Sequence, residues 1–182
     1  MKYSLTIFIS VFFISVFFIL FAIFVAQSDE KINKKQTHIK TFLKEFSGKT
    51  KVIDGDSIIV GKKEVRLFGI DAPEYKQTCL NKENTVYNCG KMSFYYLKNL
   101  VDKKQVRCSY NKKDIYNRYL AKCYFGEISI NENLLENGMA VIYNYHNSSQ
   151  KLIDLEKKSK INKTGVWQGA FELPRHYRKR NK

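Results

Sequence analysis

The sequence predicts a mainly β domain with helices, of the α+β class, preceded by a hydrophobic N-terminal helix. Three observations support this: short segments rich in valine and isoleucine follow residue 47, a helical pattern interrupts them after the third, and an uncharged apolar stretch begins the chain. Five short strands with a helix between the third and the fourth is the element order of the OB-fold, a small Greek-key barrel. We therefore expect an OB-fold five-stranded barrel with three helices, preceded by a transmembrane or signal helix.

The N-terminal stretch IFISVFFISVFFILFAIFVA, residues 7–26, contains no charge. As a helix it would be about 30 Å long, which matches the hydrocarbon core of a bilayer. The bulky Phe24 lies two positions before Ala26, where a signal peptidase needs a small residue. We expect residues 1–27 to be an uncleaved signal-anchor, with a cleaved signal peptide as the alternative, and the polar, lysine-rich residues 28–46 to be a linker.

The remaining elements follow from periodicity and turn residues. Asp-Gly-Asp and Gly-Lys-Lys separate the first three strands, and glycines end the last two helices. The expected elements are strands over 49–54, 56–61 and 63–70, a helix over 90–101, strands over 105–110 and 119–125, and helices over 131–137 and 148–162. The domain is expected over residues 47–170, and residues 171–182 are expected to be a basic C-terminal tail that frays and can touch phosphates.

The charge balance indicates the kind of partner. Thirty-two Lys and Arg against 17 Asp and Glu give a net charge of +15, which favours polyanions such as nucleic acid or an anionic membrane surface. Charge alone does not indicate chemistry or specificity. We expect a monomer that binds DNA or RNA and is tethered to a membrane by its N-terminal helix.

The four cysteines indicate disulfides. No C-x-x-C pair or nearby histidine completes a zinc site, and an even count behind an export-like segment favours disulfide bonds. Three pairings are possible; we favour Cys79 with Cys89, which bracket a polar loop, and Cys108 with Cys123, which lie in two arms of one hairpin. Free thiols in a cytosolic protein are the alternative.

Disulfides and flanking charges disagree on the compartment. The lysines after the apolar stretch favour a cytoplasmic location for the domain that follows it, because positively charged flanks prefer the cytoplasm. Large domains are nevertheless translocated despite basic flanks. We therefore expect a domain anchored in the cell membrane and facing the periplasm or exterior, or a secreted protein if the N-terminal segment is cleaved.

Three aspartates can form an oxygen-rich metal site. Asp54 and Asp56 are two residues apart in a strand-like segment, so their side chains point to the same side. Asp71 can join them, because the proline after Ala72 restricts Ala72 to extended conformations and orients its carbonyl. Calcium accepts carboxylate and carbonyl oxygens in loose geometry.

The remaining charged residues fit phosphodiester hydrolysis. Glu74 lies three residues after Asp71, free to act as a general base towards a water molecule. Arg66 and Arg118 offer planar guanidinium groups to phosphate oxygens.

Each motif also has a structural explanation. Asp-Gly-Asp alone is more often a turn, and Asp71 to Glu74 also fits a helix start with a capping box. Tyrosines such as Tyr116 and Tyr143 are more often packing or surface aromatics than base-stacking surfaces. The joint occurrence of these motifs favours a catalytic site.

The motifs VIDGDSIIV, VRLFGIDAPE, DIYNRYLAKCYF, INENLLENGMAVIY and TGVW follow one another between residues 48 and 167. In this order they resemble the staphylococcal nuclease, or thermonuclease, family, and especially its exported Gram-negative branch. The resemblance implies a calcium-dependent endonuclease with an OB-type barrel. A membrane-tethered OB-fold module that binds nucleic acid or protein without catalysis is the alternative.

The resemblance also implies a role for each site residue. In the metal site, Asp56 and Asp71 would be carboxylate ligands of Ca2+ and Ala72 a carbonyl ligand, with Asp54 just behind them. The implied catalytic residues are Glu74 as the base and Arg66 and Arg118 as phosphate-binding groups, with Tyr116 beside the phosphate and Tyr143 in the nucleotide pocket.

Overall fold

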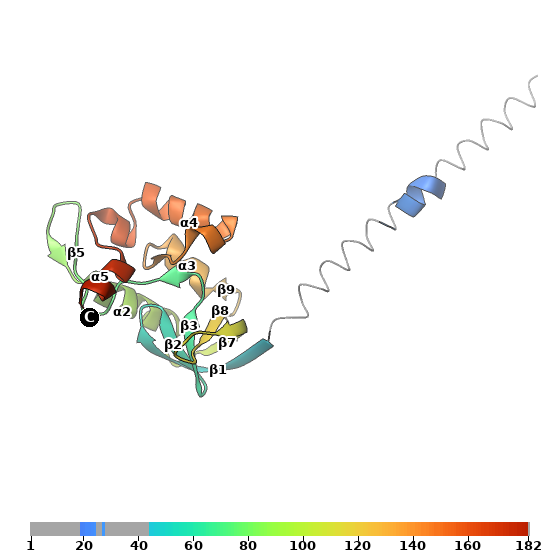
Figure 1. The fold of residues 1–182 in the computed structure, drawn as a ribbon, viewed down its shortest axis with the longest axis horizontal. Helices are drawn as coiled ribbons and strands as arrows, with labels where there is room; N and C mark the ends of the chain where they lie inside the picture. The colour runs from blue at the N-terminus through green and yellow to red at the C-terminus, as the bar shows by residue number, and fades with distance from the viewer. Residues whose placement is uncertain (1–18, 25–26, 28–43, 182) are drawn as a thin grey trace, which may run out of the picture. The chain divides into compact units, whose positions relative to one another are not determined.

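The computed structural model describes residues 19–24, 27 and 44–181. The chain divides into two units, Met1–Leu43 and Lys44–Lys182. In the first unit, residues 19–24 are helical (Figure 1). These six residues are exposed. Most of the hydrophobic helix predicted over residues 7–26 lies outside the described residues. Among those described, no helix has both the length and the apolar character needed to span a bilayer.

In the second unit, five strands form a closed barrel (Figure 1). The strands are β1 (Lys44–Asp54), β2 (Ser57–Val60), β3 (Lys63–Leu67), β7 (Gln105–Lys113) and β8 (Tyr119–Phe125). They pair in the order β3-β2-β1-β7-β8, and the parallel pairing of β3 with β8 closes the barrel. The short β9 (Ile128–Ser129) continues the sheet beyond β8. The predicted five-stranded barrel is confirmed.

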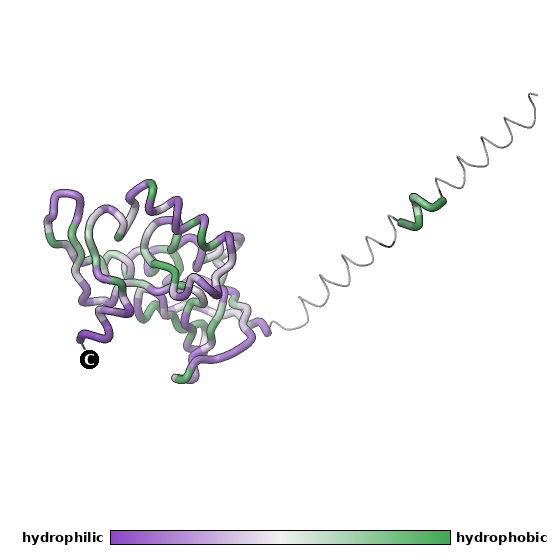
Figure 2. The backbone as a smooth tube through the Cα atoms, turned by 45° about the horizontal axis from the view of Figure 1, so that its top comes forward, coloured by the Kyte–Doolittle hydropathy of each residue, from purple (hydrophilic) through white to green (hydrophobic). Residues whose placement is uncertain are grey.

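The three predicted helices are present, as α2 (Cys89–Val101), α3 (Ile130–Glu136) and α4 (Gln150–Ile161). Each contributes to the main core: Leu97 of α2, Leu134 of α3 and Leu152 of α4 are buried there together with strand residues such as Ile58 and Val65. Hydrophilic and hydrophobic positions alternate along much of the tube in Figure 2, as expected for elements with one buried face.

The strand β1 begins earlier than predicted, at Lys44, and pairs with β7 from there to Lys49. Phe46 explains the extension, because its ring packs against the rings of Tyr110 and Tyr119, with centroid distances of 5.5 and 5.2 Å. One aromatic side chain therefore gives this polar segment a buried face.

The strand predicted over residues 63–70 is divided at Gly69. Gly69 has a φ of +85°, a left-handed conformation that favours glycine, so the chain turns out of the barrel after β3. The next two residues form β4 (Ile70–Asp71), which pairs with β10 (Val141–Ile142) instead. This turn places Asp71 at one end of the barrel.

Both favoured disulfides, Cys79–Cys89 and Cys108–Cys123, are present. Cys108 and Cys123 are directly opposite one another in the β7–β8 pair. Cys79 lies in β5 (Cys79–Leu80), which pairs with β6 (Val86–Tyr87) in the loop before α2.

The C-terminal residues do not fray as expected. After two 3₁₀ helices, η1 (Tyr145–Asn147) and η2 (Gly165–Gln168), the chain forms helix α5 (Pro174–Arg180). The segment before α5 packs into a second apolar cluster with the Cys79–Cys89 disulfide. The expectation failed because a basic run has no apolar periodicity of its own and is held here by tertiary contacts.

Candidate active site

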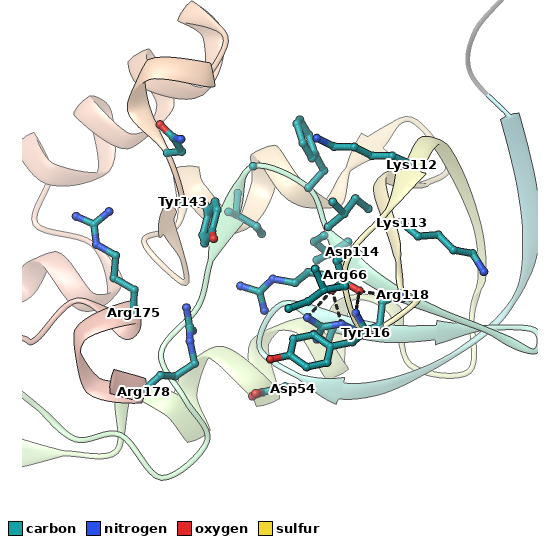
Figure 3. Close-up of a pocket in the computed structure, with 18 of the residues that line it drawn as sticks. Asp54, Arg66, Lys112, Lys113, Asp114, Tyr116, Arg118, Tyr143, Arg175 and Arg178 are labelled. Atoms are coloured by element: carbon teal, nitrogen blue, oxygen red, sulfur yellow. Dashed lines mark hydrogen bonds and ion pairs between the residues drawn. The ribbon is translucent and has the colours of Figure 1, made fainter. Parts of the chain in front are cut away.

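The predicted site residues gather at a groove of about 1480 Å³ (Figure 3). The six that line it are Asp54, Arg66, Glu74, Tyr116, Arg118 and Tyr143. The other three, Asp56, Asp71 and Ala72, are buried. Residues that are up to 89 positions apart in the sequence therefore contribute to one site.

Arg66 connects two buried carboxylates. Its Nη1 lies 2.7 Å from Oδ1 of Asp56 and its Nη2 lies 2.7 Å from Oδ1 of Asp71. Asp56 and Asp71 are only 3% and 1% exposed, so neither meets solvent freely. Oδ2 of Asp56 also accepts a hydrogen bond of 2.9 Å from the backbone N–H of Ala72. These contacts hold the β1–β2 turn against β4.

Glycine is required in the β1–β2 turn for this close approach. A Cβ atom at Gly55 would lie 2.8 Å from Cβ of Ala72 and 3.2 Å from Cβ of Ser93. The backbone at Gly55 could not pack this closely with a side chain in place, and Asp56 would then lie further from the Ala72 amide.

The site concentrates negative charge. Burial raises the pKa of Asp54 to about 6, and the nearby carboxylates of Asp56 and Glu74 add to the shift. Burial also raises the pKa of Asp56, although the Arg66 guanidinium opposes it. A positive charge placed among these carboxylates would stabilise their ionised forms.

Arg178 of α5 is a site residue that the sequence analysis missed. Its Nη1 lies 2.9 Å from Oδ1 of Asp71 and 2.7 Å from Oε1 of Glu74, and its Nη2 lies 3.0 Å from Oδ2 of Asp71. Burial opposes the charged form of Arg178, but the hydrogen bonds that it donates to both carboxylates raise the pKa of Arg178 above its ordinary value. The sequence pattern that could have indicated this role is the spacing of the basic residues 175, 178 and 179, which would share one face of a helix.

Gln77 holds the loop that carries Glu74. Its Oε1 accepts the Glu74 backbone N–H at 3.2 Å, and the Glu74 carbonyl accepts the Gln77 backbone N–H at 2.7 Å. Its Nε2 donates to the carbonyl of Glu172 at 2.7 Å, just before α5. The alternative in which Asp71 starts a helix is wrong, because Asp71 lies in β4 and the next helix begins at Cys89.

Asp114 orients Arg118 on the β7–β8 hairpin. Oδ2 of Asp114 accepts from Nε and Nη2 of Arg118, each at 2.8 Å, while its Oδ1 accepts the backbone N–H groups of Tyr116 and Arg118, each at 2.9 Å. Burial opposes this ionised carboxylate, but its hydrogen bonds from Arg118 lower the pKa of Asp114. Arg118 lines the groove without joining the carboxylates that bind Arg66, and Asp114 was not predicted.

Tyr116 and Tyr143 present exposed rings to the groove. They are 69% and 53% exposed, so neither is a packing aromatic, while the alternative of a surface aromatic agrees with this exposure. The Tyr116 ring centroid lies 5.5 Å from the Arg118 guanidinium carbon. The Tyr143 backbone N–H donates to the carbonyl of Gly69 at 3.0 Å, which fixes it beside the turn that precedes Asp71.

The buried oxygens of Asp56, Asp71 and Ala72 fit a hard cation. Among the described residues, no three His, Cys, Asp or Glu side chains are already arranged around a metal position. Asp56 and Asp71 nevertheless offer carboxylate oxygens, which hard cations prefer. Both carboxylates already bind one cationic group, the Arg66 guanidinium. Adding the Ala72 carbonyl gives the mixed oxygen set that calcium accepts. A cation at these oxygens would replace at least some of the guanidinium contacts.

Comparison with known proteins places this site in a family. Residues 64–169, more than half of the chain, match the family model described as "Staphylococcal nuclease homologue". The match includes Arg66, Asp71, Glu74 and Arg118.

Individual relatives agree with this match. The chain is 31% identical over 138 residues to "Succinoglycan biosynthesis protein ExoI" of Rhizobium meliloti (strain 1021), covering 75% of this chain and 72% of that protein. It is 33% identical over 129 residues to an "Uncharacterized endonuclease" of Escherichia coli O157:H7, covering 68% and 78%. It is 31% identical over 128 residues to "Endonuclease YncB" of Bacillus subtilis (strain 168), covering 64% and 59%. The chain therefore belongs to the staphylococcal nuclease family of phosphodiester hydrolases.

Proposed function

We propose that the protein is a calcium-dependent endonuclease that cuts DNA or RNA with little sequence specificity. The observation that supports this most directly is the pair of buried carboxylates, Asp56 and Asp71, which are bridged by Arg66; Arg66 itself lines a basic groove together with Glu74. The charged groups in this groove suit phosphates, and contacts to phosphates carry no direct sequence information.

Asp56, Asp71 and the Ala72 carbonyl are the proposed calcium ligands. When bound, calcium would neutralise charge on the phosphate and favour ionisation of a nearby water molecule. Arg66 has to exchange its contacts with Asp56 and Asp71 for phosphate oxygens, and Arg118 offers a second guanidinium from the hairpin. Planar guanidinium groups stabilise the negative charge that accumulates on phosphate oxygens as the bond breaks.

Glu74 is the proposed general base. Its Oε1 binds Arg178, while its Oε2 has no hydrogen-bond partner among the described residues. In the proposed step, Glu74 takes a proton from water, the water oxygen forms a bond to phosphorus, and the bond from phosphorus to the leaving oxygen breaks. The leaving oxygen then takes a proton from solvent.

The test is cleavage of single-stranded DNA by the purified full-length protein, with calcium or with a chelator. We expect cleavage only with calcium, and we expect Glu74→Gln to lower the rate roughly 10²- to 10⁴-fold, the usual contribution of a general base. The exposed Glu83 provides the matched control, since Glu83→Gln makes the same change in the neighbouring loop. Wild-type protein that binds DNA but leaves it intact with calcium would favour the non-catalytic binding module instead.

We also propose that the domain works outside the cytoplasm, anchored by residues 1–27 or released if that segment is cleaved. The two disulfides support this, because disulfides persist in oxidising compartments. Protease treatment of intact spheroplasts should digest the nuclease domain. Protection of the domain in intact spheroplasts, with digestion only after lysis, would contradict the proposal.

A further inference from the structure

One face of α5 is basic and lines the active-site groove. Arg175, Arg178 and Lys179 are spaced three and four residues apart, so they share one side of the helix, and all three line the groove. Arg180 belongs to the same helix but does not line the groove, and its Nη2 binds Glu172 at 2.7 Å. Figure 2 shows this C-terminal segment as strongly hydrophilic.

Two of these cations have no acidic partner. Arg175 and Lys179 are exposed, and no carboxylate of the described residues lies within ion-pair distance of either. Arg178, by contrast, binds Asp71 and Glu74. Arg175 and Lys179 are therefore available to an external anion.

Figure 3 shows how these groups surround the groove. Arg175 and Arg178 extend from α5 on one side, Tyr116 and Arg118 belong to the β7–β8 hairpin on the other, and Arg66 lies between them. The groove thus has a wall on each side of the carboxylate site, and each wall carries positive charge.

The α5 wall is held firmly enough to serve as a binding surface. Arg178 anchors the helix to Asp71 and Glu74, while Gln77 binds the carbonyl of Glu172 at 2.7 Å. The backbone N–H of Leu80 donates to the carbonyl of Ala170 at 2.8 Å, tying the preceding segment to β5. These contacts fix the helix beside the residues that carry the proposed chemistry.

We propose that α5 is the second wall of the nucleic-acid groove and that Arg175 and Lys179 bind phosphates next to the phosphate that is cut. This inference rests on the proposed nuclease function and specifies its substrate: a strand with several phosphates, held between α5 and the hairpin. The opposite wall contributes Lys112 and Lys113. A groove of this kind follows the backbone of a single strand and does not depend on its sequence.

The test is equilibrium binding of a fluorescein-labelled single-stranded oligodeoxynucleotide to the full-length protein in a chelator, where no cutting is expected. The test variant is Arg175→Gln/Lys179→Gln. The matched control is Lys157→Gln/Arg180→Gln, which removes the same charge from two exposed positions outside the groove. Thermal unfolding of each variant checks that the fold is unchanged.

The test variant should bind far more weakly than the control. Each phosphate contact on a single strand adds about 0.7 to the slope of log K against log salt concentration. Over a tenfold change in salt, from about 1 M to about 0.1 M, each contact therefore changes the Kd about fivefold. Loss of two contacts should therefore raise the Kd about 25-fold and reduce the slope by about 1.4. The control should retain the wild-type slope.

The outcomes separate this inference from the proposed function. If the wild-type protein cuts DNA with calcium but the test variant and the control bind DNA equally well, α5 is not a substrate wall and only this inference is overturned. If the wild-type protein neither binds nor cuts DNA, the proposed function fails and this inference fails with it.

Discussion

At the scale of single residues, the same carboxylate oxygens serve two purposes. Asp71 binds Arg66 through Oδ1 and Arg178 through both oxygens, and Asp71 is also a proposed calcium ligand. A carboxylate that is 1% exposed needs a positive partner, since an isolated buried charge is very unfavourable. The two arginines provide that partner in this structure, and the proposed calcium ion would be a further positive partner.

We therefore predict that Arg178→Gln binds calcium more tightly than the wild type. Removing a positive charge 2.9 Å from Oδ1 of Asp71 relieves both competition for that oxygen and repulsion of the cation. The expected gain in affinity is about tenfold, a conservative value for a unit charge a few ångströms away in a partly buried site. Isothermal titration calorimetry with calcium, without DNA, measures the affinity.

Arg180→Gln is the control for this titration, because it removes one charge from the same helix at a residue bound to Glu172. Weaker calcium binding by Arg178→Gln would show instead that Arg178 positions the ligands.

Asp54 should make the calcium-free protein less stable as pH rises. Its pKa is raised from 3.8 to about 6, chiefly by burial, so between these values the native state retains a proton that the unfolded state has lost. The contribution of Asp54 to stability is therefore fully present below pH 3.8, falls as the pH rises to about 6, and is constant above that. Urea unfolding of wild type and Asp54→Asn across this range isolates the effect in the difference between them. A difference that does not change with pH would contradict it.

At the scale of secondary structure elements, local sequence patterns account for some elements and tertiary contacts account for others. The strands of the barrel follow from alternation, and β1 shows it well: from Phe46 to Val52 its residues are alternately at least partly buried and exposed. The helix α5 has no such pattern. It depends on Pro174 in its first turn, on Arg178, and on the connection through Gln77.

Gln77→Ala should loosen α5 and lower the stability of the domain. The Gln77 side chain is fully buried and bonds to both Glu74 and Glu172, so its removal leaves a backbone N–H and a carbonyl without partners. The expected loss is about 2 to 3 kcal/mol of unfolding free energy. Urea unfolding measures that loss, and hydrogen exchange should accelerate at residues 174–180.

The surface glutamine of α4, Gln150, gives the control Gln150→Ala, with little expected change because its contact to Asp154 is exposed. Unchanged exchange in α5 after Gln77→Ala would mean that the other contacts, among them those of Arg178, hold the helix without Gln77.

At the scale of the whole molecule, the net charge suits the expected substrate and the two disulfides stabilise the elements around the site. The net charge of +15 accompanies a groove lined by basic side chains, among which Arg66 binds the buried carboxylates of Asp56 and Asp71. The basic lining suits the phosphates of a polyanion, while the buried carboxylates suit a divalent cation. The Cys108–Cys123 bond joins two barrel strands, and the Cys79–Cys89 bond lies in the apolar cluster that supports the segment before α5.

Calcium should stabilise the whole domain. A ligand that binds only the native state adds about 2.7 kcal/mol at 100 times its Kd, so the melting temperature should rise with calcium concentration. Asp71→Asn should abolish that rise, because it removes a ligand oxygen charge while leaving a side chain of similar size. Thermal unfolding followed by circular dichroism measures both. An equal rise in wild type and Asp71→Asn would place the calcium elsewhere.

The sequence by itself determined the order of the barrel strands, the three main helices and the motif residues of the site, because periodicity, turn residues and short motifs are local properties; it favoured the observed disulfide pairs among three possible pairings. Only the tertiary structure decided the rest. Barrel closure depends on β3 meeting β8, and the contacts of Arg178 with Asp71 and Glu74 join residues more than 100 positions apart. Gln77 and Asp114 acquire their roles only from the backbone groups and side chains that folding brings to them. Such long-range contacts leave no periodic trace in the sequence, which is why the basic C-terminal segment was expected to be a frayed tail while the structure makes it a wall of the groove.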